Sequence, residues 1–427
     1  MKALKYKYLY WLLILFMAAE VFINPIGEFP LNDDWAYSKL VFNYIEKGVI
    51  SSTGWEGSLF YPQMFLGIIL SNIFGFSFSI LRLAVVIISI MGLALFFIFF
   101  NRLTRSVALT TIGSVLIVFN PIYLQYANTF YPDVPYTIVT FLSFSFLLYF
   151  LCTGYSKDYL LGLFFAILAI SLKQTAVSIL VAFAATYLIF NKKNLKSVVF
   201  CLFPLIVITL FLLSYQYFSK IIGVLPGYGA YSDMANIIFR IIISPTIVDI
   251  QKIGYYFLNT TLVLGLFVFP VAIPSSYVLY RKKVYSKLQL TWLILGFVLY
   301  AFVIVIKIYL RGKYIPFSSN NVYDIGLGPI VLTGIEQNMI PGISGAGRLF
   351  WFFISLIGAI GFVSMIFLFI LSIKEYLTDS NNEKRHHVIT SVFSLLVLFI
   401  FIVPHLLVNV MARYLMAILP FLLLVIF

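Results

Sequence analysis

Two adjacent acidic residues, Asp33 and Asp34, follow the first long apolar segment of the chain. Their neighbours Trp35 and Tyr37 are aromatic residues of the kind that lie at a membrane surface. Carboxylates are costly near hydrocarbon, so a doublet of like charges there indicates more than solvation. A carboxylate can act as a general base toward a hydroxyl. Asp is also a preferred helix N-cap, and capping by one acid is compatible with base catalysis by the other.

Further charged residues stand where the same membrane surface is expected, namely the carboxylate Asp133 and the cations Arg82, Lys173, Arg348 and Arg413. Each arginine opens an apolar segment and could be an anchor whose side chain extends to water, while Asp133 could be an N-cap. An ammonium between two apolar segments, as at Lys173, requires water or an anion. Arginine grips two phosphate oxygens at once. Acids and cations together therefore suit transfer of a group from a lipid-linked anionic donor.

The composition places these residues in a multi-pass membrane protein. Apolar residues make up 62% of the 427 residues, charged residues only 10%, and the mean hydropathy is +1.05. A soluble domain carries about 25% charged residues, so a soluble fold is excluded. Cys152 and Cys201 both lie inside apolar runs, and no disulfide framework is expected.

Apolar runs bounded by charges predict an all-α fold with about twelve transmembrane helices. The expected spans are 8–25, 81–101, 107–126, 134–152, 159–173, 175–190, 197–217, 253–280, 288–309, 347–373, 388–409 and 413–427. We expect the chain to turn at Lys173 rather than continue as one long helix, because the turn keeps the basic residues Lys157 and Lys192 on one side.

The distribution of basic residues predicts the orientation. Sixteen of the 28 basic residues fall in the connections on one side, among them Lys2, Arg102, Lys157, Lys192 and Arg281. The positive-inside rule makes this side cytoplasmic. We therefore expect a plasma (inner) membrane protein with a cytoplasmic N-terminus and a first span retained as an anchor. The net charge of +13 follows from this topology and does not indicate nucleic-acid binding.

The longest connections lie on the opposite, extracytoplasmic side, at 26–80, 218–252 and 311–346. Function is expected there, within a single membrane-embedded domain of residues 1–427. After Asp33 and Asp34, the spacing of apolar residues predicts a helix lying in the membrane surface. The apolar stretch from Pro62 to Phe76 is short for a span and predicts a second juxtamembrane helix.

Five motifs in this order resemble the GT-C superfamily of integral-membrane glycosyltransferases. They are Asp33-Asp34-Trp35-Ala36-Tyr37, the passage from Tyr61-Pro62 to Leu81-Arg82-Leu83, Asn120-Pro121 with Thr129 to Pro135, Ser171-Leu172-Lys173-Gln174-Thr175, and Ala412-Arg413-Tyr414-Leu415 with Leu419-Pro420. Within the superfamily, the resemblance is to the bacterial branch related to protein mannosyltransferases and aminoarabinose transferases. It covers about the first 195 residues and the last 20.

The resemblance implies a transfer of sugar from a polyprenyl-phosphate donor to an extracytoplasmic lipid, glycan or protein acceptor. In that family the first acid of the doublet is the base, which points to Asp33. The usual second acid is Glu, whereas this chain has Asp34, so both acids are candidates. Members of that family bind the donor phosphate with basic residues near the positions of Lys173 and Arg413, which makes these two the candidates here. Further candidates are Arg82 and Arg348 for the phosphate, and Asp133, Tyr37 and Tyr414 in support.

Attack by one hydroxyl that one carboxylate activates implies inversion at the sugar. No cofactor is required, because Lys and Arg can neutralise a leaving phosphate, although a divalent metal could assist the acids. No metal site is expected from the three histidines, which have no carboxylate or Cys cluster beside them. Two other functions remain open. A transporter or lipid flippase would use the same cations to guide an anionic substrate, and a polysaccharide polymerase would make a long product.

Overall fold

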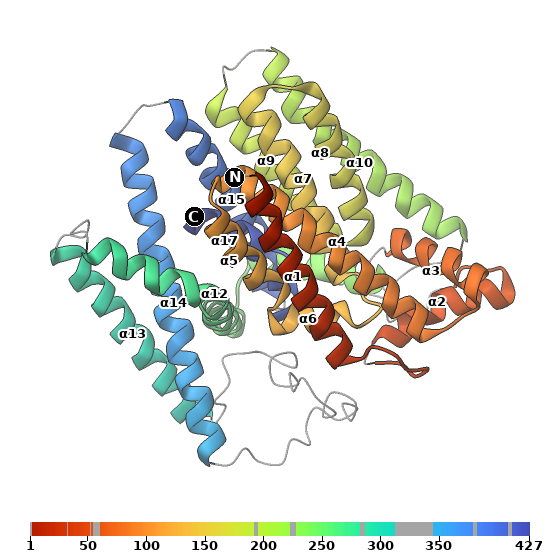
Figure 1. The fold of residues 1–427 in the computed structure, drawn as a ribbon, viewed down its shortest axis with the longest axis horizontal. Helices are drawn as coiled ribbons and strands as arrows, with labels where there is room; N and C mark the ends of the chain where they lie inside the picture. Colours follow the sequence, from red (N-terminus) through yellow and green to blue (C-terminus); the bar gives the residue numbers. More distant parts are fainter. Residues whose placement is uncertain are drawn as a thin grey trace.

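The computed structural model describes residues 2–31, 33–51, 53, 60–191, 195–222, 228–281, 287–311, 345–378, 382–408 and 412–427. Throughout these residues the regular structure is helical, as Figure 1 shows, and no strand occurs in them. The prediction of an all-α membrane protein is confirmed.

The first half of the chain forms ten helical elements. They are α1 (Lys2–Ile23), α2 (Asp34–Lys47), α3 (Tyr61–Phe74), α4 (Phe78–Thr104), α5 (Val107–Val118), α6 (Pro121–Ala127), α7 (Asp133–Thr153), α8 (Ser156–Leu172), the 3-10 turn η1 (Gln174–Ala176) and α9 (Val177–Phe190). The second half continues with α10 (Leu195–Ile222), α11 (Tyr228–Ile243), α12 (Ile247–Arg281), α13 (Lys287–Arg311), α14 (Gly345–Thr378), α15 (Asn382–Val408), α16 (Ala412–Met416) and α17 (Leu419–Ile426).

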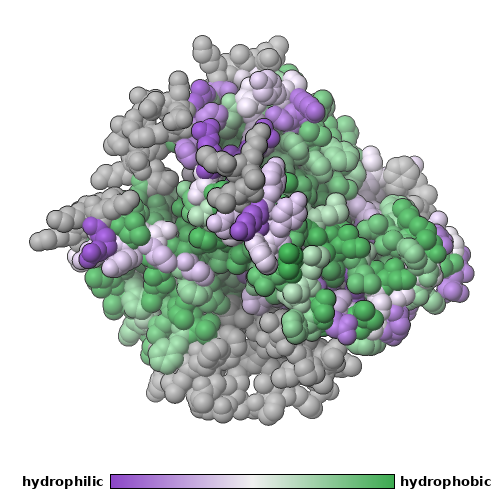
Figure 2. All heavy atoms as spheres, in the orientation of Figure 1, coloured by the Kyte–Doolittle hydropathy of each residue, from purple (hydrophilic) through white to green (hydrophobic). Residues whose placement is uncertain are grey.

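Several of these helices are long and apolar enough to cross a membrane. Among the described residues there are seven, or eight if the bent pair α5 and α6 forms one span, and three shorter apolar helices accompany them. The twelve predicted spans are compatible with this set, but their number stays a prediction. Apolar residues form much of the face in Figure 2, and hydrophilic residues gather toward the top, near α2 and α3, and in smaller groups at the centre and the left edge. This is the distribution expected of a protein surrounded by lipid.

Two predicted spans are broken, and proline explains both breaks. The span predicted at 107–126 is two helices, α5 and α6, that meet at an angle of 61°. Asn120 accepts a hydrogen bond from the Ile122 amide and Pro121 begins α6, so the sequence starts a new helix there. The span predicted at 413–427 likewise divides into α16 and α17, with Pro420 in the first turn of α17. A continuous helix was the wrong prediction in both places.

Three local predictions are confirmed. The chain turns at Lys173, whose backbone is extended (φ −147°, ψ 129°) between α8 and η1. The two helices predicted in the first long connection are present as α2 and α3.

The connection predicted at 218–252 is not a simple loop, because helix α11 occupies much of it. Most of the connection predicted at 311–346 lies outside the described residues.

Helix α7 lies at the centre of the bundle, with nearly all its residues buried. It packs along α8, α4 and α15, and α9 and α17 in turn pack on α15 (Figure 1). A second tight contact joins α12 and α14 through glycines. A Cβ on Gly265 would meet the backbone of Gly358 and Phe362, and a Cβ on Gly361 would meet the carbonyl of Gly265. Backbone therefore lies against backbone where these two helices cross.

Candidate active site

The partly exposed acid of the doublet, Asp33, lies immediately before α2 and faces the start of α16. Its Oδ2 is 3.8 Å from Nη1 of Arg413, and the two side chains are 31% and 16% exposed. The Nε–H of Arg413 is buried and has no hydrogen-bond partner among the described residues. A buried guanidinium donor without a partner is uncommon, and this one is a candidate to bind an anionic acceptor.

A second acid–cation pair lies beside the first. Asp133 begins α7, and its Oδ1 is 2.5 Å from Nζ of Lys173 at the turn between α8 and η1. The α7–α8 hairpin thus brings together two residues that are 40 positions apart. Asp133 is almost fully buried, whereas the Lys173 side chain is 14% exposed. Ion pairing explains how an ammonium is tolerated between two apolar helices.

Tyrosine rings join the two pairs into one cluster. The ring of Tyr414 has Lys173 Nζ 5.2 Å from its centre and Arg413 Cζ 5.4 Å from it. Tyr131 contacts Arg413 in the same way, with Cζ 5.5 Å from the centre of its ring. Such cation–π contacts hold the two positive charges in place without neutralising them. We name these four charged residues, Asp33, Arg413, Asp133 and Lys173, the acid–cation cluster.

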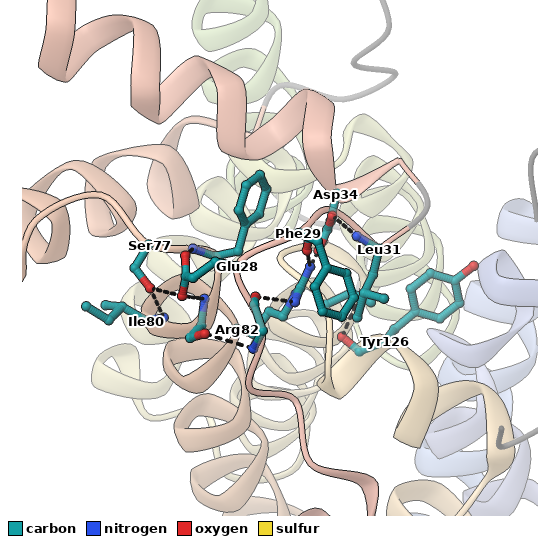
Figure 3. Close-up of polar contacts among 12 residues, drawn as sticks. Glu28, Phe29, Leu31, Asp34, Ser77, Ile80, Arg82 and Tyr126 are labelled. Carbon is teal, nitrogen blue, oxygen red and sulfur yellow. Dashed lines mark hydrogen bonds and ion pairs between the residues drawn. The ribbon is translucent and has the colours of Figure 1, made fainter. Parts of the chain in front are cut away.

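The other acid of the doublet is sealed from this cluster. Asp34 is 0% exposed, and its Oδ2 lies 3.0 Å from Nε of Arg82, which is itself 1% exposed (Figure 3). Arg82 also donates to the carbonyls of Gly27 and Phe29, and the Leu31 amide donates to Asp34 Oδ1 at 2.6 Å. Burial raises the pKa of Asp34 to about 6, and the Arg82 guanidinium opposes that rise. The pair fastens the segment before α2 onto α4.

Glu28 makes a second set of contacts that hold the segment before α2 against the start of α4 (Figure 3). Its carboxylate accepts hydrogen bonds from the Ser77 hydroxyl at 2.6 Å and from the amides of Phe78 and Ser79 at the start of α4. The hydrogen bonds from Ser77 and Ser79 hold the pKa of Glu28 to about 2. A carboxylate at a helix N-terminus is favourable, since it satisfies free amide donors. The position of Asp33 is therefore set by contacts on both sides of it.

Helix capping does not account for the doublet. Asp33 occupies the N-cap position of α2, yet its side chain makes no capping hydrogen bond. Asp34 is the first residue inside the helix and turns its carboxylate back toward Leu31. The capping role predicted as an alternative is thus wrong for Asp33. The carboxylate of Asp33 is left facing Arg413.

The remaining candidates from the sequence divide by position. Tyr37 packs behind the cluster, with its ring centre 5.3 Å from that of Tyr131. Arg348 lies in α14, and its side chain is outside the described part of the chain. No group of three or more His, Cys, Asp or Glu side chains that could hold a metal occurs within the described ranges.

Three residues near the cluster were not predicted from the sequence. Tyr126, on α6, is buried and interacts with the guanidinium of Arg413. Tyr131 lies two residues before Asp133, inside a quoted motif, but without a role. His405 lies in α15 with its ring 5.3 Å from that of Tyr414, and its Nδ1 is 2.7 Å from the Phe401 carbonyl. The break at Asn120-Pro121 was the available signal for Tyr126, because it marks a short helix turned toward the site.

Comparison with known proteins gives one match to a family model. Residues 63–215 match the model of the dolichyl-phosphate-mannose-protein mannosyltransferase family. This segment contains Arg82, Asp133 and Lys173. The match covers about a third of the chain and confirms the resemblance to integral-membrane glycosyltransferases of the GT-C superfamily.

The crystal structure of ArnT from Cupriavidus metallidurans in the apo state is similar with a TM-score of 0.41 and 14% identity. The similarity covers 97% of this chain and 76% of that one. No curated protein matches the chain.

Proposed function

We propose that this chain transfers a sugar from a polyprenyl-phosphate donor to a hydroxyl of an extracytoplasmic lipid, glycan or protein, with inversion at the sugar. The observation that carries the proposal is the acid–cation cluster. In it a partly exposed carboxylate lies 3.8 Å from a guanidinium that retains a buried free donor. A base for the acceptor and a cation for the leaving phosphate thus stand side by side.

Asp33 is the better placed of the two adjacent acids to be the base. A general base must come within hydrogen-bond reach of the proton that it removes, and accessibility precedes pKa in that choice. Asp33 is 31% exposed, whereas Asp34 is enclosed by Arg82 and by the backbone of the preceding segment. Asp34 and Arg82 accordingly have a structural role in the proposal, and Arg82 is no longer a candidate for the donor phosphate.

Arg413 and Lys173 bind the donor phosphate in this proposal. The Arg413 side chain can shift from Asp33 to the phosphate, which leaves Asp33 free to accept a proton. Lys173 is held by Asp133 and by Tyr414, so its charge is fixed beside that of Arg413. Two cations offset the charge that grows on the phosphate as the glycosidic bond breaks.

The reaction is a single displacement. The acceptor oxygen attacks the anomeric carbon, the bond from that carbon to the phosphate oxygen breaks, and its electron pair leaves with the polyprenyl phosphate. The hydroxyl proton passes to Asp33. One attack from the face opposite the phosphate gives inversion. These residues supply both the base and the charge neutralisation, so the proposal requires no metal, and activity should persist in a chelator.

The reaction is placed on the extracytoplasmic side, because the basic residues predict that the opposite ends of the helices are cytoplasmic. Purified full-length protein with a panel of polyprenyl-phospho-sugars and membrane lipids should release polyprenyl phosphate and add a single sugar. Asp33→Asn is the matched control, since it keeps the shape of the side chain. A folded protein that releases nothing with any donor would contradict the proposal, and a long polymer would instead identify a polymerase.

A further inference from the structure

A second candidate binding site lies at the far end of the hairpin that carries the acid–cation cluster. Helix α7 begins at Asp133 and ends at Thr153, and at 1.5 Å per residue its 21 residues span about 30 Å. At its C-terminal end a pocket of about 390 Å³ opens between α7, α9, α10 and α15. This site is separate from the transfer reaction and does not depend on it.

The polar side of the pocket carries the guanidinium of Arg385. Arg385 and His386, from the first turns of α15, line it together with Asn191, and no Asp or Glu occurs among the described lining residues. Nη2 of Arg385 donates to the carbonyl of Phe190 at 3.2 Å, which fixes the guanidinium at the C-terminal end of α9. A guanidinium carries five N–H donors, so this one bond leaves others for an anion or water.

The other side of the pocket is an aromatic wall. Phe150 of α7 stacks on Tyr187 of α9, with their ring centres 5.9 Å apart. The ring centre of Phe200 of α10 lies 5.1 Å from that of Phe150. Next to Phe200, the side chains of Val199 and Leu202 are 54% and 49% exposed on α10, a predicted span. The pocket therefore has the Arg385 guanidinium on one side and aromatic rings on the other, and exposed apolar residues of a predicted span follow and precede Phe200 in the sequence.

A ligand that satisfies both sides must be an anion with an apolar tail. A free phosphate would use Arg385 but not the aromatic wall, and a neutral lipid would use the wall but not Arg385. Basic pockets between helices at the cytoplasmic boundary are sites at which anionic lipid headgroups bind. On the orientation that the sequence predicts, this end of the bundle is the cytoplasmic one.

We propose that this pocket binds the headgroup phosphate of an anionic phospholipid of the cytoplasmic leaflet, with Arg385 and His386 at the phosphate and the start of an acyl chain against the aromatic wall. Such a lipid would join α15 to the ends of α7 and α9. It would thereby stabilise the helices whose opposite ends carry Asp133 and Lys173.

The experiment measures the unfolding temperature of the purified full-length protein in detergent. The probes are phosphatidylglycerol, phosphatidylcholine and inorganic phosphate. Phosphatidylglycerol should raise the unfolding temperature more than either other probe. Arg385→Gln should increase the concentration needed for half of that effect by about tenfold or more, as expected when a charge-assisted hydrogen bond is lost. Lys157→Gln is the matched control, because it removes one basic charge from the same end outside the pocket lining, and it should leave the effect unchanged.

Cys152 supplies a second measurement inside the pocket. It lines the pocket and is partly exposed, whereas Cys201 is buried. In a Cys201→Ala background, phosphatidylglycerol should slow the reaction of Cys152 with a methanethiosulfonate reagent, and Arg385→Gln should abolish the protection. Equal stabilisation by phosphatidylcholine, equal stabilisation by inorganic phosphate, or unchanged protection in Arg385→Gln would each overturn the proposal.

Discussion

Asp33 and Asp34 are the same residue type at successive positions, yet the fold gives them opposite environments. Asp34 enters α2, turns inward and is enclosed with Arg82. Asp33 lies one residue before the helix, and its carboxylate is partly exposed beside Arg413. One carboxylate is thus committed to holding the segment, and the other is free to react. In the proposed function, the acidic doublet therefore divides structure and chemistry between its members.

The largest effect should come from removing the open carboxylate. Asp33→Asn keeps the size of the side chain but removes the basic oxygen, and general-base catalysis contributes about 10²–10⁴-fold. We expect a folded protein that still binds the donor, with activity reduced by about that factor in an assay of polyprenyl phosphate release. If the variant keeps more than about a tenth of the activity, Asp33 is not the base, and Asp34 and then Asp133 become the candidates.

Breaking the sealed pair should act on stability instead. Asp34→Asn leaves Arg82 buried without a counter-charge, and loss of one partner of a buried ion pair costs about 3–5 kcal/mol. The unfolding temperature in detergent should fall, while the activity of the protein that remains folded should fall less than in Asp33→Asn. The double variant Asp34→Leu/Arg82→Met should recover part of the loss, because no buried charge remains. A stable but inactive Asp34→Asn would reverse the roles of the two acids.

A smaller effect should follow from removing either cation of the cluster. Lys173→Gln or Arg413→Gln withdraws a charged hydrogen bond from the donor phosphate, a loss of about 1.5–3 kcal/mol. The donor KM should rise about 10- to 100-fold, with little change in the acceptor KM. Arg102→Gln is a suitable control, because this cation contacts the Tyr149 ring near the opposite end of α7. An unchanged donor KM in both variants would return Lys173 and Arg413 to the role of anchors.

The smallest expected effect is a pH dependence of the hydrogen bonds that the Glu28 carboxylate accepts at the start of α4. The pKa of Glu28 in the folded protein, about 2, lies below that of a free Glu. Its ionised form therefore stabilises the fold above about pH 4, and this contribution is lost as the pH falls toward about 2. Hydrogen exchange in residues 26–31, corrected for its intrinsic pH dependence, should increase over that range. Glu28→Gln should show faster exchange at neutral pH and no further change on acidification.

The fold class was predictable because composition and apolar runs determine it. The turn at Lys173 was also predictable, since the basic residues had to fall on one side. The breaks after α5 and α16 were missed because hydropathy does not distinguish a bent span from a straight one. Asn120-Pro121 carried the necessary signal, as an N-cap followed by proline.

The chemistry at the site was only partly predictable. Residue types and order drew attention to Asp33, Asp133, Lys173 and Arg413, but the sequence could not say which cation faces which acid. Arg82 was grouped with the phosphate ligands because its place at the opening of a span resembles that of Arg413. Burial separates the two arginines, and burial depends on how the segment before α2 folds back on α4. That arrangement arises from contacts about 50 residues apart, which no local pattern encodes.

The glycine crossing of α12 and α14 also limits how the molecule can move. Where two backbones touch, a slip of one helical turn, about 5.4 Å, would place side chains where only glycine fits. This close contact blocks sliding of α12 along α14, so the two helices must move together as one rigid pair. An opening between helices must therefore occur at the margins of this helix pair, such as those where it meets α15 and α17, and not within it.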